Sequence, residues 1–91
     1  MTISLYLLKG KSDGRYQIRN PNGTKFITCS FIRGKLDGEY KEWYVTGQLK
    51  IHCFYLRGIL HGEYKNFDLN GRLNEQTWYT YGRAGFVLEY N

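Results

Sequence analysis

The sequence predicts an all-β fold, an elongated single-layer antiparallel meander of about eight strands built from repeated β-hairpins. Two observations carry this prediction. Glycines recur every 24 residues along the 91-residue chain, and the segments between them are rich in aromatic and β-branched residues. The single proline and the 18% aromatic content exclude a disordered chain, which would lack this apolar surface. A chain of this length has room for one small domain.

The repeat extends over the whole chain, because ten of the eleven glycines fall on three series spaced by 24 residues. Tyrosines keep the same spacing, and so does the pair of cysteines. A fixed period of this length is typical of stacked repeats, in which one unit alone cannot bury its apolar surface. We therefore predict a single domain over residues 1–91, with units at about 10–33, 34–57 and 58–81 and with 1–9 and 82–91 as partial capping units. The glycine series are Gly10, Gly34, Gly58 and Gly82; Gly14, Gly38 and Gly62; and Gly23, Gly47 and Gly71.

Each unit reads as two strands joined by turns of two kinds. The chain opens on an apolar stretch, residues 1–9, that we expect to be a strand. Tight turns are predicted where Gly23, Gly47 and Gly71 follow or precede turn-forming residues. At the other end of the hairpins, residues 33–38 and 57–62 have a glycine near each end of the segment. This pattern predicts connections of four to six residues.

The alternation of side chains along a strand separates two faces of the predicted sheet. In the second unit, Leu49, Ile51, Cys53 and Tyr55 share an apolar face. The residues between them give a mixed face: Lys50, His52, Phe54 and Leu56. The first and third units repeat this pattern more weakly. The sheet is therefore expected to have one better-packed side.

The sequence resembles the MORN-repeat group, and more specifically its bacterial variant, the YwqK-type antitoxins of toxin–antitoxin systems. The resemblance covers nearly all of the chain and rests on residues 34–41, GKLDGEYK, and their copy at residues 58–65, GILHGEYK. Each copy is followed by aromatic residues and a glycine turn. The resemblance implies an elongated, grooved sheet of successive hairpins that serves as a scaffold, a membrane-proximal adaptor or a protein binder. The first and fourth units depart from the pattern, as expected of end caps.

Basic residues beside the wider turns are the first candidate site. The formal net charge of +5 favours an acidic partner. Arg33 and Arg57 share one column of the repeat and Lys35 lies in the next, so the edge would display cations about 9 to 10 Å apart. The alternative is that these residues only solubilise the turns. A nucleic-acid partner is disfavoured because the aromatic residues are already needed by the fold, whereas an anionic phospholipid surface remains an alternative.

An aromatic set is the second candidate, because tyrosine and tryptophan are enriched where proteins bind one another. Some of this surface must meet a partner or water, since a single-layer sheet cannot cover both of its faces. The alternative is that the repeated tyrosines only stack along the array as its spine. The more variable residues of the set are then the better candidates for recognition. The aromatic candidates are Tyr40, Trp43, Tyr44, Tyr64 and Phe67, of which Trp43, Tyr44 and Phe67 vary between units.

Motifs of catalysis and of metal or cofactor binding are not found in the sequence, so we expect no enzyme, cofactor or metal ion. Cys29 and Cys53 occupy one column, about 9 to 10 Å apart, and are expected to be buried thiols. The N-terminus lacks the features of a signal peptide, and no apolar run reaches ~20 residues, which predicts a cytoplasmic protein.

The function expected from these features is that of a non-catalytic protein-binding module, antitoxin-like or immunity-like, that masks or scaffolds an acidic partner. The main alternative is a structural component of a larger assembly, such as a virion or a membrane-associated scaffold, formed through open sheet edges that pair with neighbours. A third alternative is an adaptor to an anionic membrane through the basic turn edge.

Overall fold

The computed structural model describes residues 12–89, and these form an all-β structure. The prediction for residues 1–9 lies outside the described part of the chain. Strands follow one another along the sequence without intervening helices in the described residues. They are β1 (Gly14–Arg19), β2 (Lys25–Ile32), β3 (Lys35–Leu36), β4 (Gly38–Trp43), β5 (Leu49–Leu56), β6 (Ile59–Leu60), β7 (Gly62–Phe67), β8 (Leu73–Thr80) and β9 (Arg83–Glu89).

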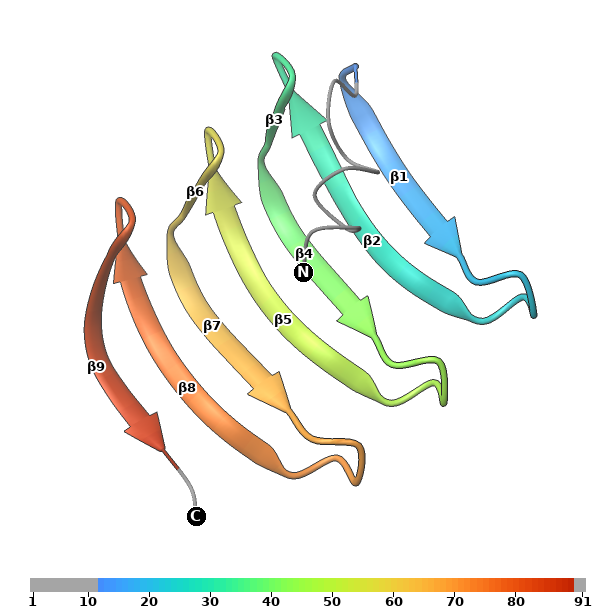
Figure 1. Ribbon diagram of the computed structural model, residues 1–91. Coiled ribbons are helices and arrows are strands. Elements are labelled where there is room, and N and C mark those ends of the chain that lie inside the picture. The colour runs from blue at the N-terminus through green and yellow to red at the C-terminus, as the bar shows by residue number, and fades with distance from the viewer. Residues whose placement is uncertain (1–11, 90–91) are drawn as a thin grey trace.

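All strands belong to one open antiparallel sheet in the order β1-β2-β4-β5-β7-β8-β9, with β3 paired to β2 and β6 paired to β5 (Figure 1). Strands that are adjacent in the sequence are adjacent in the sheet, which confirms the predicted meander of hairpins. The strands are curved and lie in a single layer (Figure 1). Strands β3 and β6 have two residues each and are short returns from the turns after β2 and β5, which brings the count to nine.

The 24-residue period of the sequence is also the period of the strand register. Tyr16 pairs with Cys29, Tyr40 with Cys53 and Tyr64 with Thr77 in three successive hairpins. A register shift recurs near the end of the first strand of each hairpin, at Ile18/Arg19, Glu42/Trp43 and Asn66/Phe67. Because each shift places one extra residue on the return strand, the bulge increases the local twist. The units are therefore copies in backbone geometry as well as in sequence.

The turns predicted to be tight sit at one end of the hairpins and are longer than expected, because Trp43 pairs with Leu49 and residues 44–48 connect the two strands. Backbone hydrogen bonds close them. Gly47 N–H donates to the Tyr44 carbonyl at 2.9 Å, and Gly71 N–H donates to the Asp68 carbonyl at 3.0 Å. Both glycines have a positive φ, 96° and 85°, which an L side chain rarely adopts. At Gly71 a Cβ would also lie 2.9 Å from Gln48 Oε1. Gly23 also has a positive φ, 92°, so the backbone conformation explains why glycine recurs at this column.

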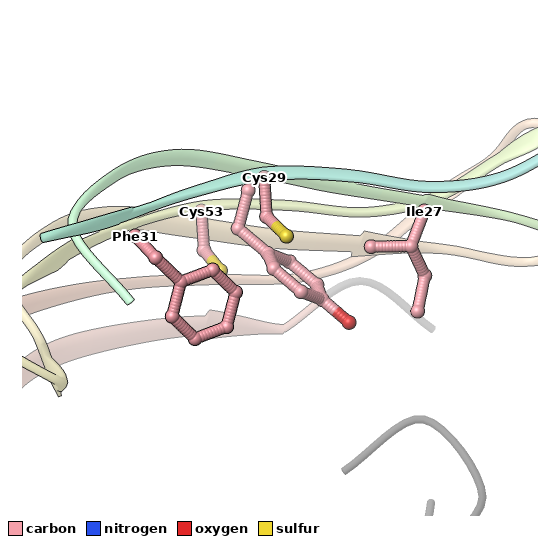
Figure 2. Packing of buried hydrophobic residues seen from close by; sticks show 5 residues of the cluster. Ile27, Cys29, Phe31 and Cys53 are labelled. Atoms are coloured by element: carbon pink, nitrogen blue, oxygen red, sulfur yellow. The ribbon is translucent and has the colours of Figure 1, made fainter. Parts of the chain in front are cut away.

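The apolar side of the sheet forms the core. Five buried residues cluster there, and their side chains point to the same side of the sheet (Figure 2). Aromatic rings meet edge to face within hairpins, with centroids 5.7 Å apart for Tyr40–Tyr55 and 6.0 Å apart for Tyr64–Tyr79. Such pairs contribute about 0.5–1.5 kcal/mol beyond their burial. The ring contacts thus join each of these tyrosines to the aromatic residue of its return strand. The buried cluster is Ile27, Cys29, Phe31, Tyr40 and Cys53.

A buried carboxylate interrupts this apolar side. Glu42 is only 4% exposed, accepts a hydrogen bond of 2.8 Å from the Tyr40 hydroxyl and lies 3.4 Å from Lys50 Nζ. Lys50 was expected on the mixed face by simple alternation. It is the extra residue opposite the Glu42/Trp43 step, because Glu42 pairs with Ile51 and Trp43 with Leu49. The bulge therefore allows the Lys50 ammonium to reach a carboxylate on the apolar side.

Candidate functional site: the groove between two wide turns

The turns at the other end of the hairpins are tighter than the sequence suggested. Ile32 pairs with Lys35 and Leu56 with Ile59, so only two residues form each connection, where four to six were expected. Both residues of each turn have a positive φ, for example 50° at Arg57 and 86° at Gly58. This is the geometry of a type I′ turn, whose twist matches that of antiparallel strands. The remaining residues of the expected connections continue as short strands.

Arginine at the first turn position is an unusual choice, because left-handed backbone is unfavourable for a residue with a Cβ. A hydrogen bond from the arginine amide to the preceding unit holds this residue in the left-handed conformation. The Arg57 amide donates to Asp37 Oδ2 at 3.0 Å, and the Arg33 amide donates to Asp13 Oδ1 at 2.6 Å. The Gly58 amide donates to the Leu36 carbonyl at 2.7 Å. Each turn is thus fixed by the unit before it, and its side chain projects from a defined backbone.

A groove of about 580 Å³ lies between the two-residue turns at residues 33–34 and 57–58. The three basic residues predicted as partner-binding, Arg33, Lys35 and Arg57, all line it. Ile32 and Leu56 add apolar surface, and Asp37 is its one acidic residue. Close packing shapes the wall, because a Cβ on Gly58 would lie 3.4 Å from Lys35 Cβ and Cδ. The structure therefore gathers these three predicted residues around one concave surface.

The charges of this groove are unequal. One carboxylate faces three cations, and Oδ2 of that carboxylate already accepts the Arg57 amide. Arg33, Lys35 and Arg57 are exposed in the structure. Arginine presents a planar fork of donors that suits carboxylate and phosphate groups, while lysine acts as a point charge. Together with the half-exposed Ile32, the groove offers sites for an anionic group and an adjacent apolar group.

The aromatic candidates do not join this groove. Trp43 and Tyr44 lie next to the tight turn at the opposite end of the hairpin, and both are half-buried. Lys25 Nζ lies 5.3 Å from the Trp43 ring centroid, and Lys50 Nζ lies 5.4 Å from that of Tyr44. The Tyr44 hydroxyl donates to the Phe67 carbonyl at 2.8 Å. This bond links the second unit to the third.

The two repeated tyrosines of the candidate set lie on the apolar side. Tyr40 is 7% exposed, and burial together with the neighbouring Glu42 raises the pKa of its hydroxyl well above the usual range. Tyr64 is half-buried against Tyr79, and burial raises its pKa as well. Both hydroxyls therefore stay protonated at neutral pH. Their contacts are those of packing within the sheet.

An ionic ladder on the opposite face was not identified from the sequence. Glu39 Oε2 lies 2.8 Å from His52 Nε2 and 3.9 Å from Lys41 Nζ. The next unit repeats the arrangement, with Glu63 Oε1 at 3.5 Å from Lys65 Nζ. The signal was present in the sequence as a Glu-x-Lys pair that recurs at 24 residues. It neutralises the middle of this face, so that the unbalanced positive charge concentrates at the turns.

Among the described residues, no group of three or more His, Cys, Asp or Glu side chains is placed to hold a metal ion. The part of the chain that the structure describes also contains no helix long and apolar enough to cross a membrane. Cys29 and Cys53 are both buried, as the sequence predicted.

Comparison with known proteins found no family model, curated protein or solved structure that matches the chain. Function is therefore inferred from the geometry described above.

Proposed function

We propose that the protein is a non-catalytic binding module that uses the groove between the turns at residues 33–34 and 57–58 to hold an acidic segment of a partner protein. The observation that carries the proposal is that Arg33, Lys35 and Arg57 line one concave surface together with apolar residues. An acidic polypeptide supplies carboxylates and apolar side chains at spacings of a few ångströms, which matches this mixture.

The rigid turn backbone adds to this argument. Because the Arg33 and Arg57 amides are bonded to the preceding unit, both side chains extend from a fixed backbone. Less conformational entropy is then lost on binding than for cations on a mobile loop. Binding of this kind would mask or scaffold the partner, and the resemblance to antitoxins of the YwqK type favours masking. An antitoxin-like or immunity-like role is the form of the proposal that we favour.

The test is affinity capture from the source lysate with three immobilised proteins. The first is the unmodified chain, and the second carries Arg33→Gln, Lys35→Gln and Arg57→Gln. The third carries three substitutions away from the groove, so that the two variants have equal net charge: Arg15→Gln, Arg19→Gln and Arg72→Gln. The washes use rising salt, which shortens the screening length from about 8 Å at 0.15 M to about 3 Å at 1 M. They therefore remove proteins that are held only by exposed surface charges.

We expect the first and third immobilised proteins to retain one acidic protein at high salt. The second should retain at least tenfold less of it. Equal retention on both variants would refute the groove as the binding surface. If all captured protein leaves at moderate salt, the proposal fails, and binding to vesicles with and without anionic phospholipid then tests the membrane alternative.

A further inference from the structure

Exposed apolar side chains gather at the end of the sheet that β9 forms. Phe86 is 90% exposed, Trp78 is 52% exposed and Leu88 is 49% exposed. Strand β9 is the last in the strand order and pairs with β8 (Figure 1). The backbone groups on its outer side therefore face away from the sheet, as they do on any edge strand. Apolar side chains beside such an edge are the features of an interaction surface.

The columns of the repeat show how this strand differs from its inner counterparts. Lys41 pairs with Thr28, Lys65 with His52 and Leu88 with Gln76 in equivalent registers. Two residues before each of them stand Glu39, Glu63 and Phe86. The Glu–Lys ion pair that covers this face in β4 and β7 is thus replaced in β9 by two apolar residues. The replacement occurs only in the described strand that lies at the end of the sheet.

The distribution of charge indicates which partner fits this edge. Residues 1–61 hold ten basic and four acidic residues, a net charge of +6, whereas residues 62–91 hold three basic and four acidic residues, a net charge of −1. Two copies of the chain would repel each other through their basic ends. They can approach through their C-terminal ends with little repulsion.

We propose that β9 is a dimerisation edge that pairs antiparallel with β9 of a second copy about a two-fold axis at Val87. This register places Phe86 of each copy opposite Leu88 of the other, so that the exposed apolar residues form cross-strand pairs on one face. Sheet extension of this type satisfies the outer backbone groups of both strands. The proposal does not depend on the function proposed for the groove.

The pairing is short. A register shift between β8 and β9 lies opposite Trp78, in the middle of β9, between the pairs that Ala84 and Val87 form with β8. The pairing proposed here therefore uses only the residues from Phe86 onward. Trp78 itself lies beside the edge and adds apolar surface to it. An interface of this length falls at the small end of the range for specific complexes. We therefore expect a weak, reversible dimer.

Sedimentation equilibrium from about 10 µM to about 2 mM tests the proposal, because a weak dimer has a dissociation constant in the micromolar to millimolar range. The variant Phe86→Lys with Leu88→Lys places like charges opposite each other across the two-fold axis. Lysine is common on edge strands of natural sheets, so the variant suits the fold of the strand. The control variant, Val45→Thr with Leu69→Thr, removes two exposed apolar residues from the tight turns instead. We expect twofold mass for the unmodified chain and the control, and dimerisation weakened at least tenfold in the first variant.

Three outcomes would overturn the proposal. They are a monomer over the whole range, equal dimerisation of the Phe86→Lys/Leu88→Lys variant, and a mass that grows beyond two chains. The last would indicate head-to-tail assembly through unlike edges.

The register has its own test by oxidative cross-linking with oxidised glutathione. A Val87→Cys variant should form a disulfide-linked dimer, because a residue on the two-fold axis faces itself at about 4.5–5.5 Å between Cα atoms. Ala84→Cys lies three residues away from the axis, so the two copies of this cysteine would be far apart and should not cross-link. If Ala84→Cys cross-links as readily as Val87→Cys, the register is wrong.

Discussion

The hydrogen bond between the Tyr40 hydroxyl and Glu42 can be measured by a double-mutant cycle. Both side chains are almost fully buried, and the hydroxyl lies 2.8 Å from Glu42 Oε1. A hydrogen bond to a charged group contributes about 1.5–3 kcal/mol, and a buried hydroxyl left without a partner costs about 1–3 kcal/mol. Glu42→Ile is a reasonable substitution because Ile18 occupies the same column of the first unit. Lys50 is partly exposed and can turn its ammonium to water.

We expect Tyr40→Phe and Glu42→Ile each to lower the free energy of unfolding, and the double variant to lose less than the sum. The expected coupling is about 1.5–3 kcal/mol. The assay is urea unfolding followed by tryptophan fluorescence. Losses that add to within about 0.5 kcal/mol would refute the reasoning, since they would show that the two groups do not interact.

A matched control exists at the same two columns of the next unit. Tyr64→Phe and Asn66→Ile remove an interaction between two neutral side chains. Neutral hydrogen bonds are roughly half as strong as those with one ionised partner, and Tyr64 is less buried than Tyr40. The coupling in this second cycle should therefore be about half of the first or less. Equal couplings in the two cycles would show that the charge of Glu42 adds nothing.

Two further predictions concern alkaline stability and the third turn. Burial raises the pKa of the Cys53 thiol from 9.0 to about 12 and also raises those of Tyr40 and Tyr55. The folded state therefore holds these protons more tightly than the unfolded state, so the free energy of unfolding should fall as the pH rises above about 9. Urea titrations measure this free energy, and a constant value up to pH 11 would contradict the prediction. His61 Nδ1 accepts a hydrogen bond of 3.0 Å from the Tyr81 amide. In the turn before it, Asp37 accepts the equivalent bond from the Arg57 amide. Thermal unfolding should show about 0.5–1.5 kcal/mol lost in His61→Ala and little or none in His61→Asp, and equal losses would exclude the role of this acceptor.

The period of the glycines was sufficient to predict the sheet, because each glycine column corresponds to a backbone position that the hairpin requires. The length of the wide turns was not predictable in the same way. Arginine is uncommon at positive φ, so Arg33 and Arg57 do not read as turn residues. The groups that hold them there, Asp13 and Asp37, stand twenty residues earlier in the sequence. A pattern read along the chain does not show which unit supplies a contact to the next.

The candidate site was predictable in part for a related reason. Arg33, Lys35 and Arg57 could be placed on one edge by column alone, and they do share a groove. Trp43 and Tyr44 were chosen because they vary between units, but variation does not reveal a cation over a ring or a hydroxyl bonded across units. The bulge that brings Lys50 to Glu42 also breaks the simple alternation on which the sequence argument relied.

The turn edge shows how one repeat can carry two different surfaces. The backbone bonds that join units use main-chain amides and carbonyls, as in Gly58 to Leu36 and Gly82 to Leu60, so they place few demands on the side chains of the turns. Side chains in the same column are then free to differ. Lys35 becomes Ile59 and Arg57 becomes Tyr81 one unit later, so the equivalent positions toward β9 keep one of the three cations. Because the groove and the β9 edge share no residues, their variants should act independently, and a groove variant that still dimerises would separate the two surfaces experimentally.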